Sequence, residues 1–125
     1  MIRLLFRIYQ WLKVADPRNC ALNAAYASGI GPDGLPVPPV MLVFMVAGTT
    51  EVRRFFHGGS LAAESIRATL ARHGTDVAQL GSILDFGCGC GRVLRHWADL
   101  RAELHGTDTN PRLVDWCARN LPYAH

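Results

Sequence analysis

The chain has 125 residues, of which 50% are hydrophobic and 18% are charged, and its formal net charge is +3 at pH 7. This composition is typical of a soluble domain with an apolar interior. Twelve of the thirteen basic residues are arginines, but they are scattered along the chain, so we expect no nucleic-acid-binding surface.

The first predicted element is a short cationic amphipathic helix in an N-terminal helical segment, residues 1–28. One side of its helical wheel carries Arg3, Arg7, Gln10 and Lys13, and apolar residues fill the rest. The helix is too short and too charged to span a bilayer, and no secretory cleavage site follows it. Two interpretations stay open. The helix docks on the rest of the protein, or residues 1–15 contact a membrane surface, with Tyr9 and Trp11 at the interface.

Residues 29–40 contain four prolines and three glycines, and we expect an extended linker there. The apolar run that follows, residues 40–47, is predicted to be a helix because Pro39 suits a first helical position. Gly48 and a capping threonine then indicate a turn. Residues 41–80 together form a predicted helical flank.

A glycine pair, Gly58-Gly59, is expected to interrupt this flank. Ser60 suits the N-cap of a separate helix, Leu61 to His73, that Gly74 terminates. Before the interruption lie Phe55, Phe56 and His57. These three residues either line a substrate pocket or belong to the core, which is the more frequent place for aromatic residues on a helix.

A strand that leads into a glycine-rich loop is the most specific feature of the sequence. The apolar residues Ile83 and Leu84 precede Asp85, and Gly87, Gly89 and Gly91 then follow at every second position. Glycine permits the backbone dihedrals of a sharp strand-to-helix turn and lets a ligand lie against the main chain. A helix is predicted to begin near Arg92. Its buried face would contain Val93, Leu94, Trp97 and Leu100.

A second strand and helix repeat this arrangement. The strand ends at Asp108, and Asn110 and Pro111 suit the N-cap and the first residue of the following helix. Its buried stripe would contain Leu113, Val114, Cys117 and Leu121, and residues 121–125 are expected to be a loop. Two such units in tandem predict a parallel α/β fold with a ligand at the carboxyl ends of the strands.

Residues 83–91, Ile-Leu-Asp-Phe-Gly-Cys-Gly-Cys-Gly, resemble motif I of the class I S-adenosylmethionine-dependent methyltransferases. The stretch Leu104 to Pro111 is similar to the second motif of that family. The resemblance covers about Ser82 to Leu121. It implies a Rossmann-like methyltransferase fold, of which residues 81–125 hold the first two strand–helix units. Because the family has a seven-stranded sheet, we expect a truncated, cofactor-binding portion.

The resemblance also implies a cofactor, S-adenosylmethionine, and a role for each site residue. Gly87, Gly89 and Gly91 would lie against the methionine and ribose parts of the cofactor, and Asp85 near its amino group. Asp108 would accept hydrogen bonds from both ribose hydroxyls. Residues 41–80 would be the flank or lid found before this motif in many small-molecule methyltransferases. A small-molecule acceptor is expected, and no catalytic residue is assigned.

Two alternatives stay open. An NAD-dependent oxidoreductase shares the fold and the strand-end acid, but its G-x-G-x-x-G fingerprint would need a glycine where this chain has Arg92. The other alternative is a non-catalytic membrane-surface or interaction protein that retains a relic of the cofactor motif. The four cysteines form no C-x-x-C pair, so we expect reduced thiols in a cytoplasmic protein and no metal site. No feature indicates an obligate protein partner.

Overall fold

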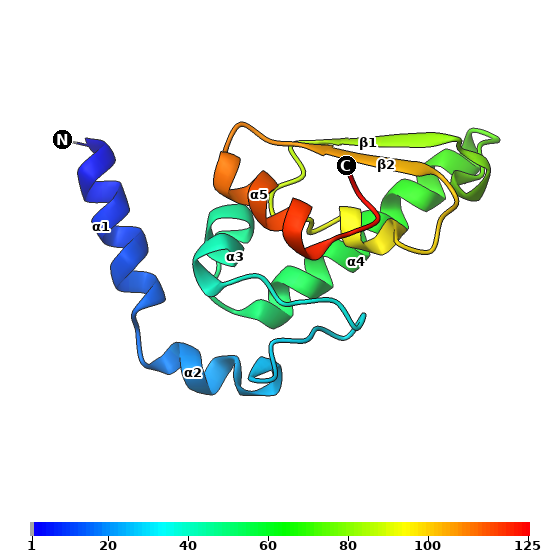
Figure 1. Ribbon diagram of the computed structural model, residues 1–125. Helices are drawn as coiled ribbons and strands as arrows, with labels where there is room; N and C mark the ends of the chain where they lie inside the picture. Colours follow the sequence, from blue (N-terminus) through cyan, green and yellow to red (C-terminus); the bar gives the residue numbers. More distant parts are fainter. Residues whose placement is uncertain (1) are drawn as a thin grey trace. The chain divides into compact units, whose positions relative to one another are not determined.

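The computed structural model describes residues 2–125, and the chain folds as two compact units whose boundary lies between Phe55 and Phe56. The first unit contains α1 (Ile2–Val14), α2 (Arg18–Leu22), η1 (Ala24–Tyr26) and α3 (Val40–Ala47). The helix α4 (Val52–Arg72) contains the boundary. The second unit continues with η2 (Val77–Gln79), β1 (Ser82–Phe86), η3 (Leu94–Trp97), β2 (Glu103–Thr107) and α5 (Pro111–Asn120) (Figure 1).

The helix predicted at the N-terminus is present as α1. Its last carbonyl groups would otherwise lack partners, because an α-helix cannot satisfy its final turn. The side-chain amide of Asn19 donates to the carbonyl oxygens of Lys13 and Val14, at 2.9 Å each. The ring of Tyr9 lies 6.2 Å from the ring of Phe44 in α3. Among residues 2–125, no helix is long and apolar enough to cross a membrane.

The expected extended linker before α3 is instead a hairpin-like turn. An antiparallel bridge joins Ile30 to Pro36, and the N–H of Val37 donates to the carbonyl of Gly29 at 2.8 Å. The prediction was wrong because proline and glycine are as typical of tight turns as of linkers. The helix predicted after the turn is present as α3, with Pro39 as its N-cap and Val40 as its first residue.

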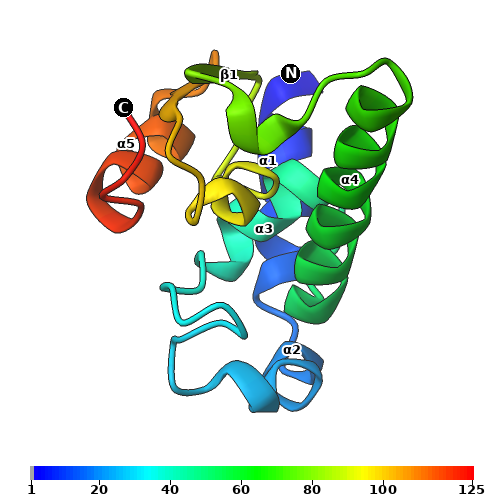
Figure 2. The same ribbon diagram turned by 90° about the vertical axis from the view of Figure 1, so that its right-hand side faces the viewer.

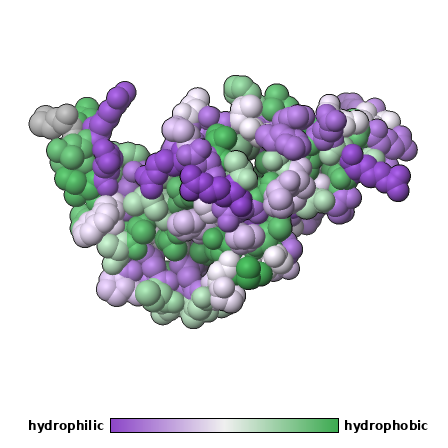
Figure 3. Space-filling view, viewed as in Figure 1, coloured by the Kyte–Doolittle hydropathy of each residue, from purple (hydrophilic) through white to green (hydrophobic). Residues whose placement is uncertain are grey.

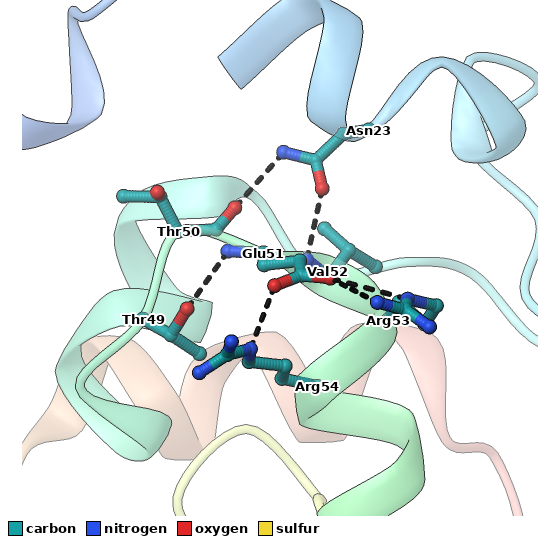
Figure 4. Close-up of polar contacts among 7 residues, drawn as sticks. All are labelled: Asn23, Thr49, Thr50, Glu51, Val52, Arg53 and Arg54. Carbon is teal, nitrogen blue, oxygen red and sulfur yellow. Dashed lines mark hydrogen bonds and ion pairs between the residues drawn. The ribbon is translucent and has the colours of Figure 1, made fainter. Parts of the chain in front are cut away.

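Asn23 holds the start of α4 from a distance in the sequence (Figure 4). Its Oδ1 accepts from the N–H of Val52, and its Nδ2 donates to the carbonyl of Thr50, both at 2.9 Å. The predicted capping threonine is Thr49, whose Oγ1 accepts from the N–H of Glu51 at 3.1 Å. Two donors near the first turn of the helix are thereby satisfied.

The predicted interruption at the glycine pair is wrong, since α4 continues through Gly58, Gly59 and Ser60. A Cβ on Gly59 would overlap with the backbone carbonyl of Arg92, so glycine here permits close packing of α4 on the segment after the glycine-rich loop. Figure 2 shows α4 beside that segment. Ser60 donates to Glu64 at 2.8 Å, one turn ahead, and does not cap a helix.

The second unit contains a two-stranded parallel sheet, as the sequence predicts. Ile83 pairs with Leu104, and Asp85 pairs with Gly106. The helices α4 and α5 lie on one side of the strands (Figure 1), and the other side of β1 is uncovered, with Leu84 59% exposed and Phe86 86% exposed. This arrangement is an α/β fold with helices on one face of a parallel sheet.

Residues 121–123 are a loop, as predicted, but the last two residues of the chain pair with β2. Ala124 forms a parallel bridge with Leu104, and the N–H of His125 donates to the Leu104 carbonyl at 2.8 Å. The N–H of Gly106 donates to the carbonyl of His125, also at 2.8 Å. The strand β2 therefore has parallel neighbours on both edges.

Between the strands, the helix predicted near Arg92 is only the short 3₁₀ segment η3. Leu94 and Trp97 are buried, as predicted for its inner face, whereas Val93 and Leu100 are half-buried. The chain must return to β2 within a few residues, and a short connection favours 3₁₀ hydrogen bonds. The predicted helix after β2 is α5, and Asn110 caps it by accepting from the N–H of Arg112 at 3.1 Å.

Candidate functional site

The glycine-rich loop, residues 87–91, joins the carboxyl end of β1 to η3. Gly87, Gly89 and Gly91 have φ values of 81°, 57° and 77°. These values lie in the left-handed region, where a Cβ is unfavourable, so the backbone itself explains a glycine at every second position.

The first and the last glycine of this loop, Gly87 and Gly91, have different surroundings. A Cβ on Gly91 would collide with the side chain of Leu121, so this glycine lets the loop pack on the end of α5. A Cβ added to Gly87 would have no atom of the described residues within 4 Å, apart from those of Gly87 and its two neighbours in the chain. The backbone at Gly87 is therefore open to an approaching ligand, whereas Gly91 is required by packing.

The end of β2 holds the loop in place. The carbonyl oxygen of Thr107 accepts from the N–H groups of Gly87 and Cys88, at 2.7 and 2.9 Å. The carboxylate of Asp108 accepts from the N–H of Gly89 at 3.0 Å and from the N–H of Asn110 at 2.8 Å, each through a different oxygen. Each carboxylate oxygen can accept more than one hydrogen bond, so Asp108 keeps acceptor capacity for a ligand.

Asp85 is the second acid of the site and lies in β1. Its carboxyl group is half-buried, and this burial raises its pKa above the ordinary value of 3.8, although Arg92 and the N–H of Leu94 act in the opposite direction. The negative charge of Asp108 contributes to the increase. The Oδ2 atom of Asp85 is buried and has no hydrogen-bond partner among residues 2–125. Such an oxygen favours a ligand that brings a donor or a positive charge.

The three thiols beside the loop, those of Cys88, Cys90 and Cys117, are buried. A hydrogen bond with Cys117 lowers the pKa of Cys88. Cys117 and Cys88 direct their sulfur atoms to the carbonyl oxygen of Gly89, at 3.4 and 3.6 Å. Burial raises the pKa of Cys90 to about 12, and a hydrogen bond with Cys88, together with burial, raises the pKa of Cys117. Only Cys20 is exposed. Within residues 2–125, no group of three or more His, Cys, Asp or Glu side chains is arranged to hold a metal ion.

The structure brings all five sequence-predicted site residues to the carboxyl ends of β1 and β2. These residues are Asp85, Gly87, Gly89, Gly91 and Asp108. Sequence reasoning missed the carbonyl of Thr107, which has no signal in the sequence because any residue type supplies a carbonyl. The aromatic residues Phe55 and Phe56 are buried, as the core interpretation expects, whereas His57 is exposed.

A cavity of about 320 Å³ lies near the site, between β2, α5 and the end of the chain. Its lining includes Gly106, Val114, Cys117 and His125. None of the five predicted residues lines it, so the cavity borders the loop from the α5 side and does not contain the two carboxylates.

The arrangement offers hydrogen-bond acceptors at an open backbone turn. The carboxylate of Asp108 lies close enough to Asp85 for its negative charge to help raise the pKa of Asp85. Such acceptors suit a ligand with hydroxyl and cationic groups. Comparison of the chain with protein-family models, curated proteins and solved structures finds no match.

Proposed function

We propose that this chain is the S-adenosylmethionine-binding portion of a class I methyltransferase that methylates a small molecule. The observation that carries this proposal is the hydrogen bond from the Gly89 N–H to the Asp108 carboxylate. It joins the acid at the end of β2 to the glycine-rich loop at the end of β1, the two parts that the resemblance assigns to one cofactor. A ligand at the ends of parallel strands is also the general rule for such folds.

The charges of the site support this cofactor. S-adenosylmethionine is a cation at its sulfonium and at its ammonium group, and Asp85 and Asp108 are the nearby acids. The unfilled Oδ2 of Asp85 would accept from the ammonium group, and the remaining lone pairs of Asp108 would accept from the ribose hydroxyls. When bound, the cofactor supplies an activated methyl group, so the protein mainly aligns an acceptor with it.

The same features disfavour NAD. Its pyrophosphate is an anion that dinucleotide-binding proteins hold at the N-terminus of a long α-helix after the loop. Here the loop leads into the short segment η3, whose few residues add little dipole. Asp85, with its unpaired oxygen, would repel a phosphate.

Calorimetric unfolding of the full chain with and without S-adenosylhomocysteine tests the proposal. We expect one ligand-dependent transition, stabilised by about 2.7 kcal/mol at a hundredfold excess over the dissociation constant. Asp108→Ala should lose this response, whereas Asp115→Ala, which removes an exposed acid from α5, should retain it. The absence of any shift with S-adenosylhomocysteine, or an equal shift with NAD, would contradict the proposal.

A further inference from the structure

An apolar stripe on α1 is left uncovered by the fold. Leu4, Ile8, Trp11 and Leu12 follow the spacing of one helix face, and each side chain is between 47% and 63% exposed. Within residues 2–14 no side chain of α1 is buried. Contiguous exposed apolar residues of this kind indicate a surface that contacts a partner.

The side of α1 that contacts the rest of the first unit is not the apolar stripe. Gln10 and Val14 are the half-buried residues of the helix, and Tyr9 contacts Phe44 of α3. Asn19 fixes the last carbonyl groups of α1. These contacts keep the helix formed while the apolar stripe points away from its neighbours in the unit. In Figure 3, α1 shows hydrophobic residues beside strongly hydrophilic ones.

Basic residues lie next to the apolar stripe. Arg3 and Arg7 form an adjacent row one turn apart, and the sequence of α1 contains no acidic residue. Two copies of this helix would bring like charges together, which disfavours self-association. An anionic surface would instead satisfy the arginines while the apolar stripe leaves water.

The length and aromatic residues of α1 also fit a lipid surface. Thirteen residues extend about 20 Å as an α-helix, which is shorter than the roughly 30 Å of a bilayer core. Trp11, in the apolar stripe, is 63% exposed and belongs to a residue type that prefers the headgroup region. We propose that α1 docks this protein in the plane of an anionic lipid bilayer, with its apolar stripe inserted and Arg3 and Arg7 at the lipid phosphates.

Flotation of the full chain with phosphatidylcholine vesicles, with and without phosphatidylserine, tests this docking. We expect binding to the anionic vesicles and at least about tenfold weaker binding to the neutral ones. The Arg3→Gln/Arg7→Gln variant should lower the affinity about 25-fold, because each of the two charges near an anionic surface is worth roughly a fivefold change. Ile8→Gln/Leu12→Gln should lower it by at least about tenfold without changing the charge.

The matched control is Arg101→Gln/Arg119→Gln, which removes two exposed charges outside α1 and should bind like the wild type. All variants should unfold at the wild-type temperature, since α1 has no buried side chain within residues 2–14. Equal binding to neutral and anionic vesicles would overturn the proposal, as would equal losses in the two arginine variants. A dimer that Ile8→Gln/Leu12→Gln dissociates, without vesicle binding, would assign the stripe to a second copy instead.

Discussion

Asp108 and Gly89 are joined by a hydrogen bond, in which the glycine N–H donates to Oδ2 of the carboxylate at 3.0 Å. The other oxygen of Asp108 accepts from the N–H of Asn110, just before α5. One side chain therefore fixes both the glycine-rich loop and the start of the next helix. A residue in this position sets the shape of the site before any ligand arrives.

Replacing Asp108 with alanine is expected to destabilise the protein by about 1.5–3 kcal/mol, the usual effect of losing a hydrogen bond to a charged group. It should also abolish stabilisation by S-adenosylhomocysteine. Urea unfolding with and without the ligand measures both effects. Asp108→Asn keeps the size of the side chain but places an NH₂ group against one of two N–H donors, so it should lose most of the ligand response. Wild-type ligand response in both variants would remove Asp108 from the site.

Asp85→Asn is expected to raise stability at pH 7 and to weaken the response to S-adenosylhomocysteine. Burial raises the pKa of Asp85, so the folded state binds its proton more tightly than the unfolded state does. The stability that this proton binding contributes to the folded state is fully present below the ordinary pKa of 3.8. It is lost as the pH rises through the raised pKa of the folded state. Unfolding free energies measured from pH 4 upward should therefore fall less steeply in the variant. A variant that is less stable than the wild type at pH 7 would show that the charge is favourable in the folded protein.

Gly59 and Gly58 provide a matched pair within α4. Gly59→Ala should cost about 1–3 kcal/mol, because its Cβ would overlap with the Arg92 carbonyl and force the backbone to move. Gly58→Ala should instead stabilise the protein by about 0.5–1 kcal/mol through helix propensity, since its Cβ would lie 3.4 Å from the end of the Arg92 side chain. Thermal unfolding compares the two variants. Equal effects would mean that α4 is not packed on the loop as described.

Asn23→Ala should destabilise the first unit by about 1–2 kcal/mol, because it leaves the Val52 N–H and the Thr50 carbonyl without their side-chain partner. Hydrogen exchange at the Val52 amide gives a local measurement and should become faster. Asn23→Asp keeps the acceptor for Val52 and loses only the donor to Thr50, so its amide should remain protected. Unchanged exchange in Asn23→Ala would contradict the capping role.

Local chemistry explains what the sequence predicted correctly. The parallel strands follow from apolar runs that end in acids, and α5 follows from Asn110 and Pro111, which satisfy and preorganise its first turn. The sequence also predicted that the three glycines and the two acids would lie together at the strand ends, since they occur at characteristic positions along the chain. Their role in binding a cofactor stays a prediction. These features depend on neighbours in the chain, so they can be inferred without the fold.

Features that depend on residues far apart in the sequence were decided by the tertiary structure alone. The low helix propensity of glycine predicted a break in α4. Gly59 instead lies within the helix, where it contacts the backbone of Arg92. The long-range hydrogen bonds of Asn23 and of His125 leave no pattern in the nearby sequence. The same is true of the burial that raises the pKa of Asp85. The sequence thus determined which residues form the elements and the loop, whereas only packing between distant segments determined where helices continue, which surfaces stay uncovered and how the acids meet the glycines.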